Sequence, residues 1–310
     1  MKGLVIKSTG ADCLVCSDNK IIDCKIRGKI RLDGLRSTNP VAVGDYVEFD
    51  IDGDFGVISA ILPRKNFIVR KATNLSKQKH IIASNVDFSV LIVTIKMPKT
   101  PVEFIDRFLV ASMAYNVDVL LVFNKIDLLD DDENQMLDNL VDTYSKIGYS
   151  VLKTSVTDNS GIDALKDFIS NKTVLISGNS GVGKTSLVEK LQPGLKLKTA
   201  EISASCNQGK HTTTFAEMYF TDLGARIIDT PGIRGFGITG MSPQDVAHNF
   251  KEFFKRLSDC KFYNCTHTHE PGCAVKQAVE NGEIALSRYK SYLSIITDDD
   301  SKYRNNNSAI

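Results

Sequence analysis

The residues best suited to chemistry lie in the segment Gly178–Thr185, which has the sequence Gly-Asn-Ser-Gly-Val-Gly-Lys-Thr. It follows the apolar stretch Thr173–Ser177 directly and leads into a stretch of good helix formers, Lys184–Leu191. Glycines let backbone N–H groups converge on phosphate oxygens, a lysine reaches the β- and γ-phosphates, and a hydroxyl binds magnesium. Strand, loop and helix come in the required order, which disfavours a chance glycine-rich loop. The segment predicts a phosphate site in which Lys184 contacts phosphate and Thr185 contacts Mg²⁺.

A second polar segment, Asn124–Asp127 (Asn-Lys-Ile-Asp), follows the apolar stretch Val117–Phe123. This placement predicts a position at the carboxyl edge of a sheet, where ligands of open α/β folds bind. The Asp127 carboxylate accepts two hydrogen bonds and therefore suits the ring N–H and exocyclic amine of guanine, whereas adenine lacks the ring donor. Alone, such a string is usually a helix cap or a turn, but beside a phosphate loop it predicts guanine specificity. Ser155, after the stretch Tyr149–Thr154, is expected to offer a backbone N–H to the guanine carbonyl, with a plain turn as the alternative.

A third segment, Asp-Thr-Pro-Gly at residues 229–232, follows the apolar stretch Ala225–Ile228. Asp229 is expected to hold the magnesium shell through water, and the Gly232 N–H to sense the γ-phosphate. Residues 209–214, Gly-Lys-His-Thr-Thr-Thr, lie between this segment and the phosphate loop, and Thr213 is the favoured second magnesium ligand. The predicted nucleotide-binding set is Asn124, Lys125, Asp127, Ser155, Gly178, Asn179, Ser180, Gly181, Val182, Gly183, Lys184, Thr185, Ser186, Asp229 and Gly232. The predicted magnesium ligands, direct or through water, are Thr185, Thr213 and Asp229.

The order of these segments indicates a circular permutation. In Ras-like GTPases the phosphate loop comes first and the base-reading segments come last. Here the base-reading residues at 124 and 155 precede the phosphate loop at 178. A doubly wound sheet keeps the same site if the old termini are joined and a new cut opens elsewhere, because termini usually lie close together on the surface. The cut leads the chain from the 229–232 segment straight into the C-terminal region, so the nucleotide state is expected to pull on that region.

The hydrolytic residues are less conventional. Ras-like enzymes place a glutamine after the glycine of this last segment to orient the attacking water, and this chain has Ile233 there. An apolar side chain cannot orient water, so we expect slow hydrolysis that a partner accelerates. His211 is a candidate to orient the water, with simple packing or capping as the alternative. The predicted catalytic residues are His211, Thr213 and Lys184.

Three cysteines and two histidines crowd into residues 260–273. Cys260, Cys265, His267 and Cys273 supply a ligand set suited to tetrahedral structural zinc, with no position left open for chemistry. His269 is a competing ligand. Free core cysteines are the alternative, although the polar neighbours make a poor core. Seven cysteines in a chain too long to need disulfides also favour metal over disulfide bonds.

An α/β domain is predicted to position the nucleotide segments. Apolar stretches expected to form a parallel sheet are Val86–Ile95, Val117–Phe123, Tyr149–Thr154, Thr173–Ser177 and Ala225–Asp229. The helices between them are expected at Glu133–Ile147, Ile162–Ile169 and Lys184–Leu191. Short strands at Cys13–Cys16, Ile21–Arg31, Val41–Ile51 and Gly56–Leu62 predict an N-terminal five-stranded OB-type barrel. The predicted domains are an RNA-binding barrel at 1–72, the permuted GTPase domain at 73–240, and a helical zinc-binding domain at 241–310 with a disordered tail.

The barrel is the basic part of the chain, with 14 Lys and Arg against 9 Asp and Glu in residues 1–79. Lys25, Arg27, Lys29 and Arg31 alternate with small or apolar residues, so a strand would present all four on one face. Such a stripe attracts a phosphate backbone. A solvated strand face is the alternative, because the stripe lacks aromatics for base stacking.

Taken together, these segments resemble the RsgA (YjeQ/YloQ) family of circularly permuted GTPases over nearly the whole chain. The cysteine segment ending Glu-Pro-Gly-Cys-Ala-Val and the threonine-rich 209–214 segment carry the resemblance most specifically. The resemblance implies GTP or GDP with Mg²⁺, one structural Zn²⁺, and a late-acting assembly factor for the small ribosomal subunit. It also implies that the factor binds rRNA and is stimulated by that particle. Val156 departs from the small residue typical after Ser155, which weakens the expected base contact.

Composition narrows the remaining classes. Hydrophobic residues make up 42% and charged residues 24%, which is typical of a globular chain and excludes fibrous and membrane classes. The N-terminus lacks an apolar run of signal-peptide length, so we expect a cytoplasmic protein that binds no membrane. We also expect a monomer. Two other functions stay open: an RNA-binding scaffold in which GTP binding rather than turnover matters, and a P-loop kinase or ATPase, which Asp127 disfavours.

Overall fold

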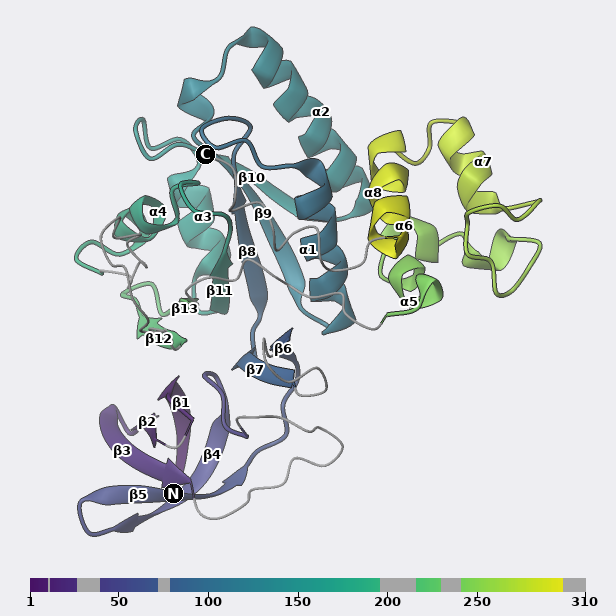
Figure 1. Ribbon diagram of the computed structural model, residues 1–310. Coiled ribbons are helices and arrows are strands. Elements are labelled where there is room, and N and C mark those ends of the chain that lie inside the picture. Colours follow the sequence, from purple (N-terminus) through teal and green to yellow (C-terminus); the bar gives the residue numbers. More distant parts are fainter. Residues whose placement is uncertain (11, 27–39, 72–78, 196–215, 230–240, 298–310) are drawn as a thin grey trace, which may run out of the picture.

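The computed structural model describes residues 1–10, 12–26, 40–71, 79–195, 216–229 and 241–297. Figure 1 shows three parts: an N-terminal barrel, a central sheet flanked by helices, and a group of C-terminal helices beside α1 and α2. The predicted boundaries at residues 72 and 240 both fall outside the described residues, so the exact domain limits stay a prediction. Among the described residues, no helix is both long and apolar enough to span a membrane.

The N-terminal strands close into the expected five-stranded barrel. They are β1 Lys2–Ser8, β2 Asp12–Ser17, β3 Lys20–Ile26, β4 Tyr46–Asp52 and β5 Phe55–Ile61. The strands follow the order β1-β2-β3-β5-β4, and β4 pairs back with β1 to close the barrel. Inward side chains such as Val15, Phe49 and Ile58 form a separate apolar core.

The strand predicted from Val41 begins five residues later, which corrects that prediction. Gly44 turns the chain with a φ of 93°, and a Cβ at Gly44 would lie 2.1 Å from the Ser84 carbonyl oxygen. The buried Asp45 carboxylate accepts hydrogen bonds from the Ala42 N–H at 2.8 Å and from the Arg64 guanidinium. This buried turn therefore holds the barrel against the next element.

A two-stranded hairpin, β6 Phe67–Lys71 and β7 Lys79–Ser84, follows the barrel. In Figure 1 it lies between the barrel and the central sheet. Asn66 donates to the Val86 and Asn116 carbonyls and accepts from the Val86 N–H, so the hairpin is fastened to the base of the sheet. The hairpin was not predicted from the sequence.

The central sheet is parallel, as expected, with one antiparallel strand beside it. The strands are β8 Phe88–Val93, β9 Asp118–Asn124, β10 Ser150–Thr154, β11 Thr173–Ser177, β12 Glu217–Phe220 and β13 Arg226–Asp229. Their order is β10-β9-β8-β11-β13-β12, and all neighbours are parallel except the pair β12 and β13. The strands read as continuous apolar runs because helices cover both faces.

Four helices cover the two faces of this sheet: α1 Val102–Ala114, α2 Asp131–Ile147, α3 Ile162–Ile169 and α4 Lys184–Leu191. Alternate residues of the strands enter two different cores. Leu91 and Leu121 pack with α1 and α2, whereas Val90 and Leu120 pack with α3 and α4. The predicted α3 and α4 are confirmed, and the predicted α2 begins two residues earlier than expected. An Asp130 capping box with Glu133 fixes that start.

The C-terminal part is helical, as expected. It contains α5 Pro243–His248, α6 Lys251–Phe254, the 3₁₀ turn η2 Leu257–Asp259, α7 Ala274–Glu280 and α8 Leu286–Thr297. Its core includes Phe250, Phe253 and Tyr292, and Val110 of α1 joins the same cluster. Helix α8 packs on α1, so the part from α5 to α8, here called the C-terminal module, is docked on the helices of the central α/β part (Figure 1).

Candidate functional site

The predicted nucleotide segments meet at one edge of the central sheet. The base-reading residues follow β9, the phosphate loop follows β11, and Asp229 ends β13. These strands are parallel to their neighbours, because β8 pairs in parallel with β9 and β11, and β11 pairs in parallel with β13. The carboxyl ends therefore share one edge, which is where open α/β sheets bind ligands.

The phosphate loop depends on glycine at positions that a side chain would block. Gly178 has a φ of 143°, and a Cβ there would lie 2.3 Å from the Ile92 carbonyl oxygen. Gly183 has a φ of 94°, and its Cβ would lie 2.4 Å from the Asn124 Nδ2 atom. The glycines thus let the loop pass close to two neighbouring strands and point toward the edge of the sheet.

Lys184 begins α4 and folds back over the loop. Its Nζ donates to the Gly178 carbonyl at 2.8 Å and to the Asn179 carbonyl at 2.6 Å. These carbonyls hold the cation above the loop, where phosphate oxygens would exchange for them as partners. Thr185 and Ser186 are exposed in the first turn of α4, beside its N-terminal N–H groups.

Asn124 connects the base-reading segment to the phosphate loop. Its side chain is buried, its Nδ2 donates to the Val182 carbonyl at 2.9 Å, and its Oδ1 accepts from the Thr154 hydroxyl at 3.0 Å. Lys125 adds a second connection, because its Nζ donates to the Gly181 carbonyl at 2.7 Å. The structure therefore brings together segments that lie more than fifty residues apart in the sequence.

Asp127 lies exposed in the 3₁₀ turn η1, Ile126–Leu128, which follows the Asn124 connection directly. Asp229 is buried at the end of β13, and its register partner Ile176 lies two residues before the phosphate loop. Asp127 thus follows β9 and Asp229 ends β13, both strands that the sequence predicted.

Ser155 differs from its predicted role as a donor to the guanine carbonyl. Its backbone N–H donates to the Ser160 carbonyl at 3.0 Å, and its hydroxyl accepts from the Thr157 N–H at 3.2 Å. The next amide, that of Val156, makes no hydrogen bond within the described part of the chain. A contact to the base from this loop would therefore fall to Val156, whose side chain packs on the α3 and α4 core.

Sequence reasoning also missed the loop between β8 and α1. The Met97 carbonyl accepts from Lys125 at 2.7 Å, and Pro98 lies beside the place of a Cβ at Gly181, 3.3 Å away. The Met-Pro-Lys-Thr-Pro string directly after an apolar strand was the available signal, since it places a turn at the same sheet edge. This loop therefore contacts the phosphate loop at Gly181.

Several predicted residues lie outside the described residues. They are Thr213, His211 and Gly232, together with Arg27, Lys29 and Arg31 of the basic stripe. Lys25, the first member of that stripe, is exposed on β3, and its Nζ lies 4.7 Å from the centre of the Phe55 ring.

The predicted metal ligands converge in the C-terminal module. Cys260, Cys265, His267 and Cys273 place one ligand atom each within 4.8 Å of the others. The Nδ1 atom of His267 lies 3.3 Å from the Cys273 Sγ and 3.8 Å from the Cys260 Sγ. A tetrahedron with bonds of about 2.3 Å has corners about 3.8 Å apart, so these donors fit a zinc-sized ion. His269 is not part of the cluster and contacts the Thr268 hydroxyl instead.

Neighbouring groups fix the metal-binding loop. The Glu270 carboxylate accepts hydrogen bonds from the Thr266 N–H at 2.8 Å and from the Thr268 N–H at 3.1 Å. The Tyr292 hydroxyl donates to the Thr266 carbonyl, and the Tyr289 hydroxyl donates to the His267 carbonyl at 2.7 Å. These contacts orient the backbone on both sides of His267, which the ligand atoms alone would not do.

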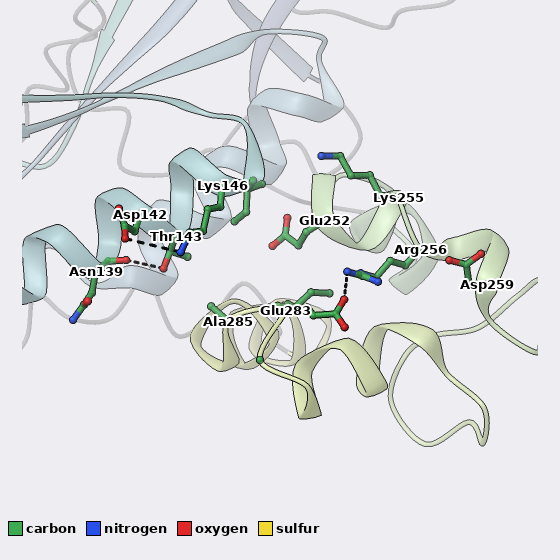
Figure 2. A pocket seen from close by; sticks show the side chains of 13 residues that line it. Asn139, Asp142, Thr143, Lys146, Glu252, Lys255, Arg256, Asp259, Glu283 and Ala285 are labelled. Carbon is green, nitrogen blue, oxygen red and sulfur yellow. Dashed lines mark hydrogen bonds and ion pairs between the residues drawn. The ribbon is translucent and has the colours of Figure 1, made fainter.

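A polar cleft of about 610 Å³ lies between α2 and the C-terminal module (Figure 2). Asn139, Asp142 and Lys146 line it from α2, and Glu252, Arg256 and Glu283 line it from the module. Both signs of charge are mixed across it, and none of the predicted nucleotide residues that the structure describes lines it. The cleft is therefore separate from the nucleotide site.

Comparison with known proteins agrees with this geometry. The family model described as RsgA GTPase matches residues 61–239, and the one described as RsgA N-terminal domain matches residues 2–58. The chain is 52% identical to the small ribosomal subunit biogenesis GTPase RsgA of Phocaeicola vulgatus, over 98% of this chain and 99% of that protein. It is 51% identical to the protein of the same name from Flavobacterium johnsoniae, over 98% of this chain and 95% of that one.

Two solved structures share the fold. YjeQ from Thermotoga maritima superposes with a TM-score of 0.79 at 37% identity, covering 96% of this chain and 97% of that one. YloQ, described as a circularly permuted GTPase, gives a TM-score of 0.73 at 29% identity, covering 96% and 93%. The segment order, the linked base and phosphate segments and these similarities agree, and the chain belongs to the RsgA family of circularly permuted GTPases.

Proposed function

We propose that this GTPase acts in maturation of the small ribosomal subunit, with that particle and its rRNA as partners. The observation that carries the proposal is similarity over the whole chain. Relatives that share 48% to 52% identity over 98% of this chain are named small ribosomal subunit biogenesis GTPases. The similarity includes the barrel and the C-terminal module, which GTP hydrolysis alone would not require.

The nucleotide site supports guanine binding with Mg²⁺. Lys184 would pair with the β- and γ-phosphates, Thr185 would bind the ion, and Asp229 would hold its shell through water. Asp127 would accept from the guanine base, because the Asn124 contact with Val182 holds its segment beside the phosphate loop. We assign Thr213 and Gly232 to the γ-phosphate side on sequence grounds.

Hydrolysis would transfer the γ-phosphoryl group of GTP to water and leave GDP and inorganic phosphate. Ile233 offers no polar group for that water, so His211 is our candidate to orient it. A site that lacks a fixed water-orienting group hydrolyses slowly until a partner orders it. The small subunit is the proposed partner, which would couple hydrolysis to its binding.

The barrel is the proposed rRNA contact. Lys25 is exposed and lies over Phe55, so β3 and β5 present a cation beside an aromatic ring, a combination that suits nucleic acid. This aromatic neighbour was absent from the sequence argument because Phe55 lies on another strand.

The cysteine cluster is proposed to hold one structural Zn²⁺ through three thiolates and the His267 Nδ1 atom. Four protein ligands complete a tetrahedral shell, so the ion would stabilise the module rather than react. It would join η2 to the start of α7, since Cys260 follows η2 and Cys273 caps α7.

The cytoplasm is the proposed location, because ribosomal subunits mature there in bacteria such as those that supply the relatives. We also propose that the chain acts as a monomer.

The test is GTP hydrolysis titrated with purified small subunits, large subunits or free rRNA. We expect small subunits to raise the turnover rate well above that of the chain alone, and the other two to raise it little. Equal stimulation by large subunits would indicate a different ribosomal GTPase. Stimulation by free rRNA alone would indicate a general RNA-binding protein, and GTP binding without turnover in any mixture would indicate a scaffold.

A further inference from the structure

The barrel is joined to the GTPase domain by the edge of the central sheet. Lys7 of β1 is in antiparallel register with Glu217 of β12, and their side chains form an ion pair at 3.7 Å. Tyr46 of β4 adds a second contact, because its hydroxyl accepts from the Arg226 guanidinium of β13 at 3.0 Å. The contacts thus involve both strands, β12 and β13, that form this edge.

The Lys7–Glu217 contact lies in one row with Ile176 of β11, two residues before the phosphate loop. Ile176 of β11 is the register partner of Asp229, Asp229 is the partner of Glu217, and Glu217 is the partner of Lys7. The four strands are neighbours in the order β11-β13-β12-β1. Adjacent strands lie about 4.8 Å apart, so the row spans about 14 Å from the phosphate-loop strand to the barrel.

The electrostatics of the row depend on what binds at Asp229. Residues in direct register place their side chains on the same face, so the carboxylates of Glu217 and Asp229 are neighbours of like charge. Lys7 offsets one end of this pair, and its side chain is only 29% exposed, which limits screening by solvent. A change of cation or phosphate charge near Asp229 would therefore alter the field at Glu217 and Lys7.

The joint is packed and is not a loose tether. Val5 of β1 enters the barrel core, whereas Leu4 and Ile6 enter a different cluster that includes Met218 of β12 and Ile228 of β13. A strand buried on both faces must follow the elements that it contacts, because cores are close-packed and transmit displacement. Movement of the β12 and β13 pair would thus reposition β1.

We propose that β12 couples the nucleotide at the phosphate loop to the barrel through the row Ile176, Asp229, Glu217 and Lys7. Coupling of this kind is reciprocal. If exchanging GDP for GTP changes the affinity of the barrel for a ligand by some factor, that ligand changes the ratio of the GTP and GDP affinities by the same factor. The inference rests on the proposed place of Asp229 at the nucleotide, and it adds a route by which a partner bound to the barrel regulates the GTPase.

The test compares two lysines of the same strand in the full chain. Lys7→Met removes the charge across the joint, whereas Lys2→Met removes a more exposed pair with Glu48, 3.8 Å long, that lies entirely within the barrel. Amide hydrogen exchange of β1 and β4 is measured with Mg²⁺ and either GDP or a non-hydrolysable GTP analogue. The dissociation constants of both nucleotides are measured in parallel.

In the unsubstituted chain and in Lys2→Met, we expect β1 to exchange at different rates with the two nucleotides. In Lys7→Met that difference should shrink, and the ratio of the two dissociation constants should shift about two- to five-fold, as removal of a partly exposed pair implies. Adding Tyr46→Phe should reduce the difference further. The inference would be overturned if the amides of β1 exchanged at the same rate with GDP and with the GTP analogue. It would also be overturned if the double variant kept the full difference in exchange rate between the two nucleotides while still binding both. Binding of neither nucleotide would overturn the proposed function as well.

Discussion

Arg288 of α8 donates to Asp106 of α1 across 2.6 Å, and neither side chain has any exposed surface. The same guanidinium donates to Glu252 of α6 at 2.7 Å, and the Tyr144 hydroxyl of α2 donates to Asp106 at 2.7 Å. The Phe250 ring lies 4.5 Å from the guanidinium carbon. One cation thus connects two helices of the C-terminal module with two helices of the GTPase domain.

This buried network constrains how the nucleotide state reaches the module. The chain enters α5 from the 230–240 segment, so a pull from the nucleotide site would act at the start of the module. Any rotation of α8 against α1 would separate Arg288 from Asp106 inside a dry interface, where an unpaired charge is costly. We therefore expect the module to move together with α1.

The first prediction concerns Asp106→Ala. Loss of this carboxylate leaves Glu252 as the one remaining ionic partner of buried Arg288 among the described residues, and breaking such a buried pair typically costs about 3–5 kcal/mol of unfolding free energy. Urea unfolding followed by circular dichroism measures it. The control is Glu283→Ala, which removes the Arg256 pair at 2.5 Å on the rim of the cleft (Figure 2) and should cost at most about 1 kcal/mol. Equal costs for both variants would contradict the role given to Arg288.

Much of the fold was predictable because the parallel strands are buried on both faces. In runs such as Thr173–Ser177, polar and apolar residues do not alternate, and the helices between the runs show a regular apolar face. The same reasoning located the phosphate loop, since strand, glycines and helix follow one another in the sequence. These are local signals, and local signals suffice where an element packs in the usual way.

Other elements were missed for physical reasons. Strand β1 has four successive buried residues, Gly3–Ile6, followed by a half-buried Lys7 and a buried Ser8. Neither alternation nor a turn therefore marked it as a barrel strand. Helix α1 is largely buried between the sheet and α8, so even polar residues such as Asp106 and Ser112 are buried. Its sequence therefore lacks the clear division into an apolar and a polar face that predicts a surface helix. Arg288 resembles any surface arginine in a helix, because its partners Asp106 and Glu252 lie far away in the sequence.

A second prediction tests the metal cluster. Cys273→Ser should reduce bound zinc, measured by elemental analysis of the purified chain, from about one ion per chain to nearly none, because three protein ligands remain. Cys16→Ser, which alters a half-buried barrel cysteine, is the matched control and should keep the ion. His269→Ala should also keep it, since His269 lies outside the cluster. Loss of zinc from His269→Ala would show that the assigned ligand set is wrong.

A third prediction concerns pH. Burial opposes ionisation of Asp87, but Lys65 and the Thr173 N–H at 2.7 Å hold the pKa of its carboxyl below the usual value. A lowered pKa in the folded state means that the ionised group stabilises the fold above the unfolded pKa of about 3.9, and that this contribution is lost as pH falls through the lower folded pKa. Asp87→Asn should therefore cost at most about 1 kcal/mol of unfolding free energy at pH 7.

The cost of Asp87→Asn should stay nearly constant down to about pH 5 and shrink below about pH 4, which urea unfolding at pH 7, 5 and 3 measures. Asp222→Asn provides the control, because Asp222 is an exposed carboxylate that accepts a hydrogen bond from the neutral Gln192 amide instead of pairing with a lysine. A cost for Asp87→Asn that does not depend on pH would show that its charge contributes nothing.

The fourth prediction tests hydrolysis through His211→Ala. If His211 orients the attacking water, the variant should bind GTP normally while its turnover in the presence of small subunits falls about 10²- to 10⁴-fold, the usual contribution of such a group. Single-turnover hydrolysis and fluorescent nucleotide binding separate the two effects. Normal stimulated turnover would leave only packing or capping for this histidine.

The last prediction exchanges the base preference through Asp127→Asn. A carboxylate accepts from both the ring N–H and the exocyclic amine of guanine, whereas an amide accepts one hydrogen bond and donates one. Xanthine presents a ring N–H beside a carbonyl and therefore matches the amide. Affinity for GTP should fall at least about 100-fold, because a donor meets a donor in a desolvated site, and affinity for xanthosine triphosphate should rise. Isothermal titration with Mg²⁺ measures both ligands.

The control is Asp130→Asn three residues later, where asparagine caps α2 as well as aspartate does and the guanine preference should persist. If Asp127→Asn kept its preference for GTP, the base would be read elsewhere, and the Asn124 contact with the phosphate loop would have only a structural purpose.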